Sequence, residues 1–427
     1  MVIADSRLAQ REASGTPIRV AMVGAGVTGH MIALQLLTPV PGIRLVAIAN
    51  RTLEKARKAY TNAGVTEGIK SVGDVATLED RVDDGKFSIV EDAKLVCKAA
   101  NIDLVIDVTG TIEFGARLAV EAINHAKHLV LVNAELDSTL GPILKFKADR
   151  AGTVITNTDG DEPGVAMTLL RYVQSLGLRP VAAGNLKGLI DKYRTPDTQR
   201  EFAAKYNQDA VKVTSFADGT KLSMEAAILA NATGFPVGQP GMYGPKCAHV
   251  KEIAKLLPEE ALLSEGLIDY ALGAEPHTGA FVVVYEDNPK KMKELAYYKM
   301  GDGPFYVFYT PYHLPHLQIA STIARAALFG DATVTPAGAP VCEVVAYAKR
   351  DLKVGEILDG VGGFMTYGVI DNAFTTSDRN LLPMGIAGGC RLMRDIPKDD
   401  AITYADAERP PGRIIDILRI EQTVRFG

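Results

Sequence analysis

The residues of this chain with the most evident chemistry lie in two short stretches near its middle. GTKLSMEAAIL, residues 219–229, carries Lys221 and, four positions later, Glu225 in an otherwise apolar pattern of helical period. Side chains at i and i+4 share one face of a helix, so we expect this cation and this carboxylate to point into one site. The alternative is an exposed ion pair that stabilises the helix by roughly a few tenths of a kcal/mol.

The second stretch, DGDEPG, places Asp159, Asp161 and Glu162 directly before another helical pattern. Acidic side chains complement the dipole at a helix N-terminus, and proline suits a first turn. Carboxylates at this spacing also suit a hard divalent cation. The two interpretations are compatible. We take Asp161, Glu162 and Glu225 as candidate ligands of Mg²⁺ or Mn²⁺, with Glu162 and Glu225 also candidate acid or base groups.

A basic cluster lies between them, in VAAGNLKGLIDKYRTP. Lys187 stands at the end of the predicted strand, and Lys192 and Arg194 share a face if the extended backbone continues. Cations gathered near a cofactor site suit an anionic substrate, either a phosphate or a carboxylate. A solvated run of surface charge is the alternative. We therefore take Lys187, Lys192, Arg194 and Lys221 as candidate substrate-binding and catalytic residues.

These residues follow a segment that predicts a dinucleotide-binding domain. IRVAMVGAGVTG runs from an apolar strand through G-x-G-x-x-G spacing into a helical pattern. The first glycine permits the tight turn, the second lets a pyrophosphate approach the backbone, and the third lets the helix pack on the strand. The predicted phosphate-binding residues are Gly24, Ala25, Gly26, Val27, Thr28 and Gly29.

The ends of the later strands predict the rest of the cofactor site. LVAIANR ends at Asn50 and Arg51. An acidic residue there favours NAD, whereas an arginine favours the 2′-phosphate of NADP; the alternative is that Arg51 is only solvated. Two further buried strands end in DVTG and VNAE. Because ligands of doubly wound sheets bind outside the carboxyl ends of the strands, we expect these residues to border the nicotinamide: Thr109, Gly110, Asn133, Ala134 and Glu135.

The order of these motifs resembles the homoserine dehydrogenase-like oxidoreductases. The resemblance is carried by VGAGVTG, IANRT, the DVTG and VNA strand ends and a second α+β domain. It implies an Asn-Gly-Thr turn in the catalytic domain and a helix motif G-x-D-a-x-x-K. This chain departs from both: the turn reads Lys187-Gly188-Leu189, and the helix has Lys221 in place of the aspartate and Glu225 in place of the lysine. Because the charges have changed places, the ammonium group of homoserine would be repelled.

Within that family the chain resembles the 1-deoxy-D-xylulose 5-phosphate reductoisomerase-like enzymes. The resemblance implies rearrangement of the ketose phosphate to a branched aldehyde, which NADPH reduces to 2-C-methyl-D-erythritol 4-phosphate, an isoprenoid precursor. A divalent cation would polarise the carbonyl and hydroxyl oxygens. The related fold also implies a homodimer. Two alternatives stay open: a dehydrogenase of another sugar acid or hydroxy acid, and a non-catalytic sensor that binds a dinucleotide.

From about residue 337 the sequence pattern changes. KRDLKVGEILD and MRDIPKDDAIT read as internal copies, and the segment resembles the SAF fold, a small β-rich module. We therefore predict an α/β chain of three parts. They are an N-terminal arm with a Rossmann NADP-binding domain over 1–158, an α+β catalytic and dimerisation domain over 159–336, and the SAF-like domain over 337–427. A helix near 313–329 is expected to return to the Rossmann domain.

Three other segments carry weaker signals. Residues 232–250, rich in glycine and proline, read either as a lid that closes through Met242, Tyr243 and Lys246 or as a plain connector. The two histidines of PYHLPHL read as structural rather than metal-ligating. Residues 61–95 read as an excursion at the rim of the first domain, without chemistry.

The bulk composition limits the classes of partner. Of the 427 residues, 47% are hydrophobic and 23% are charged, which is typical of a globular chain with more than one domain. A net charge of −5 gives no basic footprint for nucleic acid. No apolar run predicts a membrane span, and four widely spaced cysteines predict reduced thiols. We expect a cytoplasmic enzyme whose partner is a small anionic, phosphorylated substrate.

Overall fold

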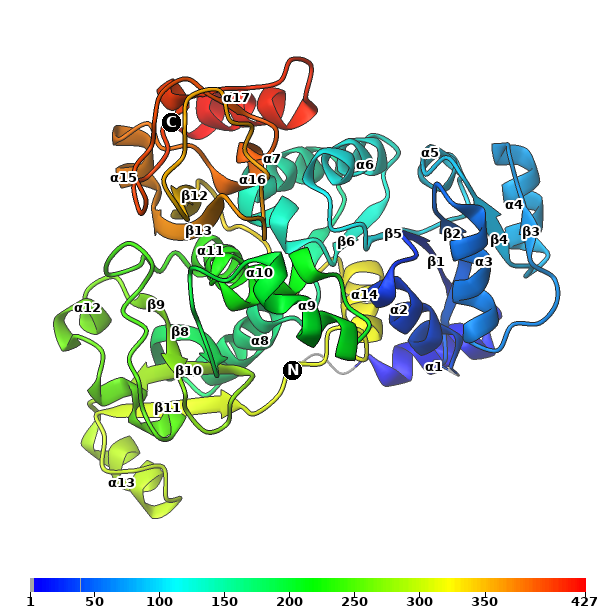
Figure 1. Ribbon diagram of the computed structural model, residues 1–427. Helices are drawn as coiled ribbons and strands as arrows, with labels where there is room; N and C mark the ends of the chain where they lie inside the picture. The colour runs from blue at the N-terminus through cyan, green and yellow to red at the C-terminus, as the bar shows by residue number, and fades with distance from the viewer. Residues whose placement is uncertain (1–3, 39) are drawn as a thin grey trace. The chain divides into compact units, whose positions relative to one another are not determined.

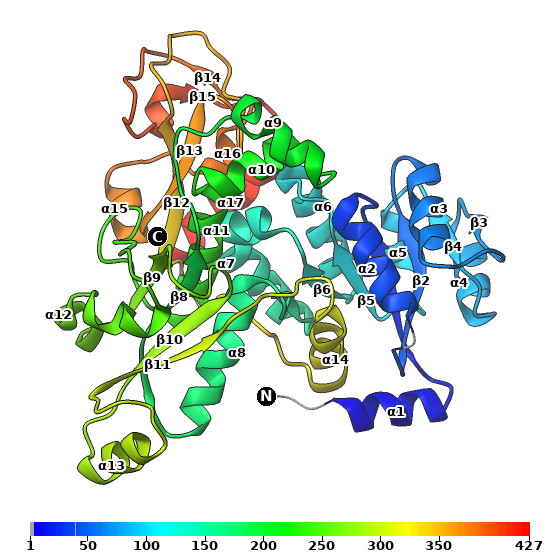
Figure 2. The ribbon, with the colours of Figure 1, turned by 60° about the horizontal axis from the view of Figure 1, so that its bottom comes forward.

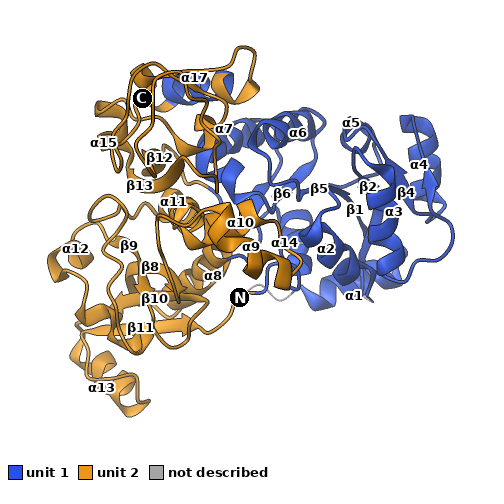
Figure 3. Ribbon diagram, in the orientation of Figure 1, with its two compact units in different colours: residues 1–161, 314–335, 417–425 blue, residues 162–313, 336–416, 426–427 orange. Residues whose placement is uncertain are grey.

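The computed structural model describes residues 4–38 and 40–427, which form two compact units (Figure 3). The first unit contains the chain up to residue 161, together with 314–335 and 417–425. The second contains 162–313, 336–416 and the last two residues. Most of the predicted SAF-like segment is thus grouped with the predicted catalytic segment, and the division into three domains stays a prediction. Among the described residues, no helix has the length and apolar character to cross a membrane.

The first unit is an α/β fold around one parallel sheet, as predicted (Figure 1). Its strand order is β3-β4-β2-β1-β5-β6-β7, which is that of a doubly wound sheet. The inner strands are almost wholly buried, because helices cover both faces of such a sheet. The strands are β1 (Ile18–Val23), β2 (Ile43–Ala49), β3 (Lys70–Ser71), β4 (Ser88–Val90), β5 (Leu104–Asp107), β6 (His128–Leu131) and β7 (Ile155–Asn157).

The helices of this unit come from both ends of the chain. Ile319, Ile323 and Ala326, three residues of one helical face, belong to the same hydrophobic core as strands β1 and β2. The helices are α1 (Asp5–Ala13), α2 (Val27–Leu37), α3 (Leu53–Asn62), α4 (Val75–Asp83), α5 (Lys94–Lys98), α6 (Ile112–Asn124), α7 (Ala134–Ala151) and α14 (Ile319–Phe329). The last helix, α17 (Ile414–Phe426), contributes residues 417–425.

The segment 61–95 corrects one expectation. It contains β4, which pairs with β2 on one side and β3 on the other, so the segment is part of the sheet and not only an excursion. All three residues of β4 are buried. A three-residue strand, Ser88-Ile89-Val90, gives no detectable period, which explains why the sequence pattern did not reveal it.

The second unit is built on a mixed four-stranded sheet of order β11-β10-β8-β9 (Figure 2). β8 runs parallel to β9 and antiparallel to β10. Leu186 of β8 faces an apolar cluster that includes the 3-10 helix η1, whereas its neighbours Asn185 and Lys187 face the opposite side, which helices α8 and α11 cover. The strands are β8 (Arg179–Lys187), β9 (Leu267–Leu272), β10 (Ala280–Tyr285) and β11 (Phe305–Thr310).

Helix α11 (Thr220–Thr233) lies at the centre of the second unit. Its residues from Leu222 to Asn231 are all buried, as expected of a helix packed on every side. It contacts α8 (Glu162–Ser175), α10 (Ala210–Ala217), β8, β9 and the strand pair of the C-terminal segment. The remaining helices of this part are α9 (Pro196–Lys205), η1 (Val250–Lys255), α12 (Glu259–Leu263) and α13 (Pro289–Tyr297).

The two internal copies of the C-terminal segment bind each other. Leu352 and Ile396, at equivalent positions, exchange backbone hydrogen bonds of 2.9 and 3.0 Å. The equivalent aspartates act in the same way: Asp351 accepts the Lys398 N–H, and Asp395 accepts the Val354 N–H. The elements here are β12 (Cys342–Ala348), β13 (Thr366–Asn372), α15 (Ala373–Asp378), α16 (Met384–Ala387), β14 (Arg391–Leu392), η2 (Tyr404–Asp406) and β15 (Ala407–Glu408).

Gly184 allows β8 and β9 to pair closely. A Cβ at this position would lie 1.6 Å from the carbonyl oxygen of Asp269 on β9. We therefore expect Gly184→Ala to lower the free energy of unfolding by about 3 kcal/mol, measured as a fall in the denaturant midpoint. Gly338→Ala is the matched control, because an added methyl group there meets no atom within 4 Å. Equal midpoints for the two variants would contradict the packing argument.

Candidate active site

The glycine-rich loop of the first unit has the space and the donors that a pyrophosphate needs. A Cβ on Gly24, whose φ is +109°, would lie 2.9 Å from the carbonyl oxygen of Val108, and one on Gly29 would lie 2.6 Å from that of Gly24. At Gly26 an added Cβ meets nothing within 4 Å. Helix α2 begins directly after Gly26, with no side-chain cap on its first N–H groups. Such a helix N-terminus fits a bound phosphate.

The end of β2 lies beside this loop. The Asn50 side chain accepts a hydrogen bond from the Ala25 N–H at 3.2 Å and donates one to the carbonyl oxygen of Thr52 at 2.8 Å. Asn50 therefore ties the strand end to the glycine-rich loop. Arg51 is exposed, and its guanidinium makes no ion pair or hydrogen bond with any described residue.

The predicted nicotinamide-bordering residues directly follow β5 and β6 and are joined by Asp107. The buried Asp107 carboxylate accepts hydrogen bonds from the Thr109 N–H and hydroxyl, at 2.9 and 2.7 Å, and from the Asn133 amide at 2.9 Å. Asn133 also donates to the carbonyl oxygen of Thr111 at 3.1 Å. These bonds hold the two strand ends together and leave Thr109 and Gly110 partly exposed.

The second unit gathers Glu162, Lys187, Lys221 and Glu225 into one cluster. Glu162 begins α8, Lys187 ends β8, and Glu225 lies in the second turn of α11. The Lys187 ammonium contacts the Glu162 carboxyl group and lies 3.4 Å from Oε2 of Glu225. The Lys221 ammonium lies 3.5 Å from Oε1 of Glu225. The pair predicted from the sequence thus forms, with its carboxylate buried and not as an exposed surface pair.

Two residues that the sequence analysis did not assign complete this cluster. The Asn185 amide donates to Oε2 of Glu162 at 3.0 Å and to Oε2 of Glu225 at 3.2 Å. Its position two residues before Lys187 on the same strand face is the signal that could have revealed it. His313, interpreted from the sequence as structural, acts electrostatically on Glu225.

The two carboxyl groups differ in protonation. Burial raises the pKa of Glu162 well above its ordinary value of 4.5, and the Glu225 carboxylate raises it further against the opposing effect of Lys187. Burial also acts to raise the pKa of Glu225, but Lys187 and Lys221 outweigh it and lower that pKa to about 2. A hydrogen bond joins the two groups. Glu162 is therefore the protonated partner and Glu225 the carboxylate.

The lysines lie nearer to solvent than the carboxyl groups. The side chains of Lys187 and Lys221 are 21% and 15% exposed, against 2% and 4% for Glu162 and Glu225. Burial alone would lower the pKa of Lys187, but the two neighbouring glutamates raise it above its ordinary value. One carboxylate against two ammonium groups leaves one positive charge in excess. A molecule that reaches this cluster from solvent meets the ammonium groups first.

Lys192 and Arg194 do not join this cluster. The extended backbone of β8 ends at Lys187, so the condition under which Lys192 and Arg194 would share a strand face is not met. Lys192 lies 3.1 Å from a carboxylate oxygen of Asp399, and Arg194 lies 3.0 Å from one of Asp191. Lys192 and Arg194 thus each pair with a carboxylate outside the cluster.

The predicted divalent-cation site does not fit the observed donors. Lys187 contacts both Glu162 and Glu225, so a cation there would have to displace an ammonium group. The third predicted ligand, Asp161, directly precedes Glu162 in the chain, and its N–H donates to the Thr158 hydroxyl at 3.3 Å. Within the described residues, no group of three or more His, Cys, Asp or Glu side chains could hold a metal ion.

A cleft of about 540 Å³ opens at the carboxyl ends of β8 and β9, directly beyond Lys187. Lys246, from the segment considered as a lid, lines it. The N–H groups of Tyr243 and Gly244 donate to the Asp269 carboxylate at 3.0 and 2.8 Å, which ties the segment to β9. Its action as a lid stays a prediction. The lining residues are Gly188, Leu189, Ile190, Lys246, Cys247, Ala248, Leu272 and Gly273.

Comparison with known families supports an oxidoreductase. Residues 160–319 match the family model described as "Oxidoreductase DRL, catalytic domain". The matched region contains Glu162, Asn185, Lys187, Lys221 and Glu225, so it includes the whole cluster. No curated protein matches the chain.

Several solved structures are distantly similar. A probable dehydrogenase from Thermotoga maritima is 13% identical, with 75% of this chain and 90% of that chain covered and a TM-score of 0.42. The scyllo-inositol dehydrogenase from Lactobacillus casei with bound NAD(H) and scyllo-inositol is 14% identical, with coverages of 62% and 73% and a TM-score of 0.37. The myo-inositol 2-dehydrogenase from Lactobacillus plantarum is 14% identical, with coverages of 64% and 75% and a TM-score of 0.34.

Removing the Lys187 ammonium would leave two buried carboxyl groups without their shared counter-charge. We expect Lys187→Met to lower the free energy of unfolding by roughly 2–4 kcal/mol near neutral pH. Because protonated carboxyl groups need no counter-charge, the loss should be smallest in acid and should grow as the pH rises and Glu225, then Glu162, must ionise. Denaturant midpoints from about pH 4 to pH 8 measure this.

Lys291→Met provides the control for that measurement, because Lys291 forms a more exposed ion pair with Glu286. Its loss should be about 1 kcal/mol or less. A second variant, Lys187→Met combined with Glu162→Gln, should recover part of the stability. A loss for Lys187→Met that does not vary with pH would contradict the assigned protonation.

Proposed function

We propose that this protein is an NAD(P)-dependent oxidoreductase that interconverts a carbonyl and a hydroxyl group on a small anionic substrate, such as a sugar acid or another hydroxy acid. The observation that carries the proposal is the contact of the buried Glu162 carboxyl group, whose pKa burial raises, with the partly exposed ammonium of Lys187. A pair of this kind can supply and recover one proton, which is what carbonyl reduction and alcohol oxidation require beyond hydride transfer.

The roles follow from which groups solvent can reach. In the reducing direction a bound nicotinamide cofactor would supply the hydride. Lys187 stabilises the negative charge that develops on the substrate oxygen and donates a proton to it. Glu162, too deeply buried to touch the substrate, returns a proton to Lys187 across their contact. In the oxidising direction the same groups take up the hydroxyl proton.

The charge of the cluster supports an anionic substrate. Glu225 is held as a carboxylate between two lysines, so it neutralises only one of them. The excess positive charge favours a substrate that carries a carboxylate or a phosphate near the reacting carbon. Lys221 is the group that we assign to this anion, and Asn185 holds the two carboxyl groups in register behind it.

A second candidate is the reductoisomerase reaction on 1-deoxy-D-xylulose 5-phosphate. The match of residues 160–319 to the catalytic domain of oxidoreductase DRL favours it, as does the resemblance of the sequence motifs. The isomerisation step would have to be assisted by Lys187 and Lys221, because the carboxyl groups do not form a divalent-cation site. The sugar-acid dehydrogenase needs only the proton relay that the cluster provides, so we place it first.

The proposal is tested by nicotinamide turnover with a substrate panel. Purified protein is offered NADPH or NADH with keto forms of sugar acids and with 1-deoxy-D-xylulose 5-phosphate, and NADP⁺ or NAD⁺ with the corresponding alcohols. We expect reduction of one class, slowed about 10²–10⁴-fold in Glu162→Gln. Because only protonated Glu162 can give up a proton, wild-type reduction should fall as the pH rises through its raised pKa. Oxidation should rise over the same interval.

The control variant is Glu286→Gln, which removes a buried carboxylate that contacts Lys291 and not the cluster. It should keep the wild-type rate and pH profile. Turnover of 1-deoxy-D-xylulose 5-phosphate alone would favour the reductoisomerase. Tight cofactor binding without turnover of any substrate would contradict both the dehydrogenase and the reductoisomerase and would leave the sensor hypothesis.

The free guanidinium of Arg51 supports NADP(H) as the preferred cofactor. Its loss in Arg51→Ala should raise the KM for NADPH by about tenfold, since hydrogen bonds to a charged phosphate are worth roughly 1.5–3 kcal/mol, and should leave the KM for NADH nearly unchanged. Steady-state kinetics with both cofactors provide the measurement. Arg57→Ala is the control, because the Arg57 guanidinium donates instead to the carbonyl oxygen of Ile69. Equal changes for both cofactors would rule out recognition of the 2′-phosphate by Arg51.

A further inference from the structure

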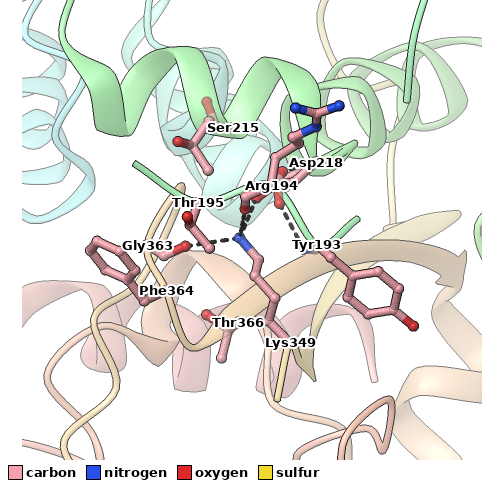
Figure 4. Close-up of polar contacts among 12 residues, drawn as sticks. Tyr193, Arg194, Thr195, Ser215, Asp218, Lys349, Gly363, Phe364 and Thr366 are labelled. Atoms are coloured by element: carbon pink, nitrogen blue, oxygen red, sulfur yellow. Dashed lines mark hydrogen bonds and ion pairs between the residues drawn. The ribbon is translucent and has the colours of Figure 1, made fainter. Parts of the chain in front are cut away.

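A buried lysine of the C-terminal segment bonds to residues of the segment between β8 and α11. Lys349, only 5% exposed, directs its ammonium at three acceptors (Figure 4). These are the carbonyl oxygen of Arg194 at 2.7 Å, a carboxylate oxygen of Asp218 at 3.0 Å and the carbonyl oxygen of Gly363 at 2.8 Å. An ammonium group has three donors, and all three are used.

The first two acceptors lie between Lys187 and Lys221 in the sequence, on the segment that joins two parts of the catalytic cluster. Arg194 belongs to the loop that leaves β8 after Lys187. Asp218 lies at the turn between α10 and α11 and also accepts the N–H of Thr220, the first residue of α11. The same two segments are joined by the Asp191 N–H, which donates to the carbonyl oxygen of Ala217 at 2.8 Å. Lys349 therefore bonds both to the loop that follows Lys187 and to the turn that precedes α11.

Strand β13 makes a second attachment to the first turn of α11. The N–H of Gly368 donates to the Thr220 hydroxyl at 2.8 Å, and its carbonyl oxygen accepts from the Ser223 hydroxyl at 3.1 Å. A Cβ on Gly368 would lie 2.9 Å from Cγ2 of Thr220, so the strand and the helix touch closely here. These bonds fix how the helix is rotated, and rotation decides where Lys221 and Glu225 point.

The internal repeat shows that the two copies differ at the position of Lys349. Aligning the two copies places Lys349 opposite Met393. Met393 is 56% exposed, whereas the neighbouring Arg-Asp pair and the apolar residue that follows it occur in both copies. The copy that faces Arg194 and Asp218 is thus the one that carries the cation.

We propose that Lys349 is a positioning residue of the active site, through which the C-terminal segment holds α11 so that Glu225 and Lys221 meet Lys187. This inference rests on the proposed function of that cluster and assigns the C-terminal segment a part in it. The mechanism is geometric. The bonds from Lys187 and Asn185 to Glu225 span 3.4 and 3.2 Å, near the upper limit for such contacts, so a small shift of α11 breaks them.

The test compares three variants. Lys349→Met removes the cation and leaves Asp218 buried without it, so we expect this variant to lose stability as well as activity. Lys349→Met with Asp218→Leu removes both charges and replaces the pair with apolar side chains, which often preserves stability. Lys353→Met is the matched control, because Lys353 lies in the same copy and pairs with Asp395 at an exposed position.

We expect the double variant to melt near the wild-type temperature and to lose about 10- to 100-fold in kcat, with the dissociation constant for NADPH unchanged. The fall in reduction rate with rising pH should move to lower pH, because Glu162 loses the effect of a correctly placed Glu225. Lys353→Met should match the wild type in every readout. A folded double variant with wild-type kcat and an unmoved pH profile would overturn the proposal, as would a change confined to KM.

A second readout separates this inference from the proposed function. The carboxyl carbons of Glu162 and Glu225, labelled with ¹³C, can be titrated by NMR in the protein without substrate. We expect the Glu162 titration to move towards its ordinary range in the double variant. That shift would support the positioning role even if the wild-type protein turned over none of the substrates. An unchanged titration would overturn the role, whatever the activity of the wild type.

Discussion

Two carboxyl groups buried against one ammonium group bring three elements of the second unit together. Glu162, Lys187 and Glu225 come from α8, β8 and α11, which are far apart in the sequence. A buried carboxylate without a partner costs several kcal/mol, so the three elements can be placed only where these groups meet. The Asn185 amide donates a hydrogen bond to each carboxyl group. These bonds limit how far β8 can slide along its strand axis.

The same constraint explains why α11 has so little exposed surface. Its polar groups are each matched to a neighbour: Thr220 and Ser223 to Gly368, Glu225 to the lysines, and Asn231 to the N–H groups of Val341 and Cys342 at 2.7 and 3.1 Å. The helix is thus held along its length by the sheet on one side and by the C-terminal segment on another. A segment that looks like an appended module in the sequence is joined to α11 by hydrogen bonds.

Local patterns revealed the parts of this structure whose signal lies within a few residues. The glycine spacing, the apolar strands of the first unit, the end of β8 at Lys187 and the i, i+4 pair on α11 all belong to this group. Patterns failed where partners are distant: no residue near Lys192 in the sequence indicates its pairing with Asp399, and none near Lys349 indicates its pairing with Asp218, 131 residues away. β4 was missed because three residues are too few for a period. Asn185 was within reach, since it alternates with Lys187.

The reciprocal pairing of the two copies in the C-terminal segment has a consequence for how such a segment can acquire a new contact. Each copy supplies the same backbone bonds and the same aspartate to the other, so the core of the module is specified twice. Positions 349 and 393 lie outside that pairing and differ between the copies: Lys349 is buried, whereas Met393 is exposed. Duplication thus separates the residues through which the two copies pair from position 349, where only one copy carries the lysine that bonds to Arg194 and Asp218.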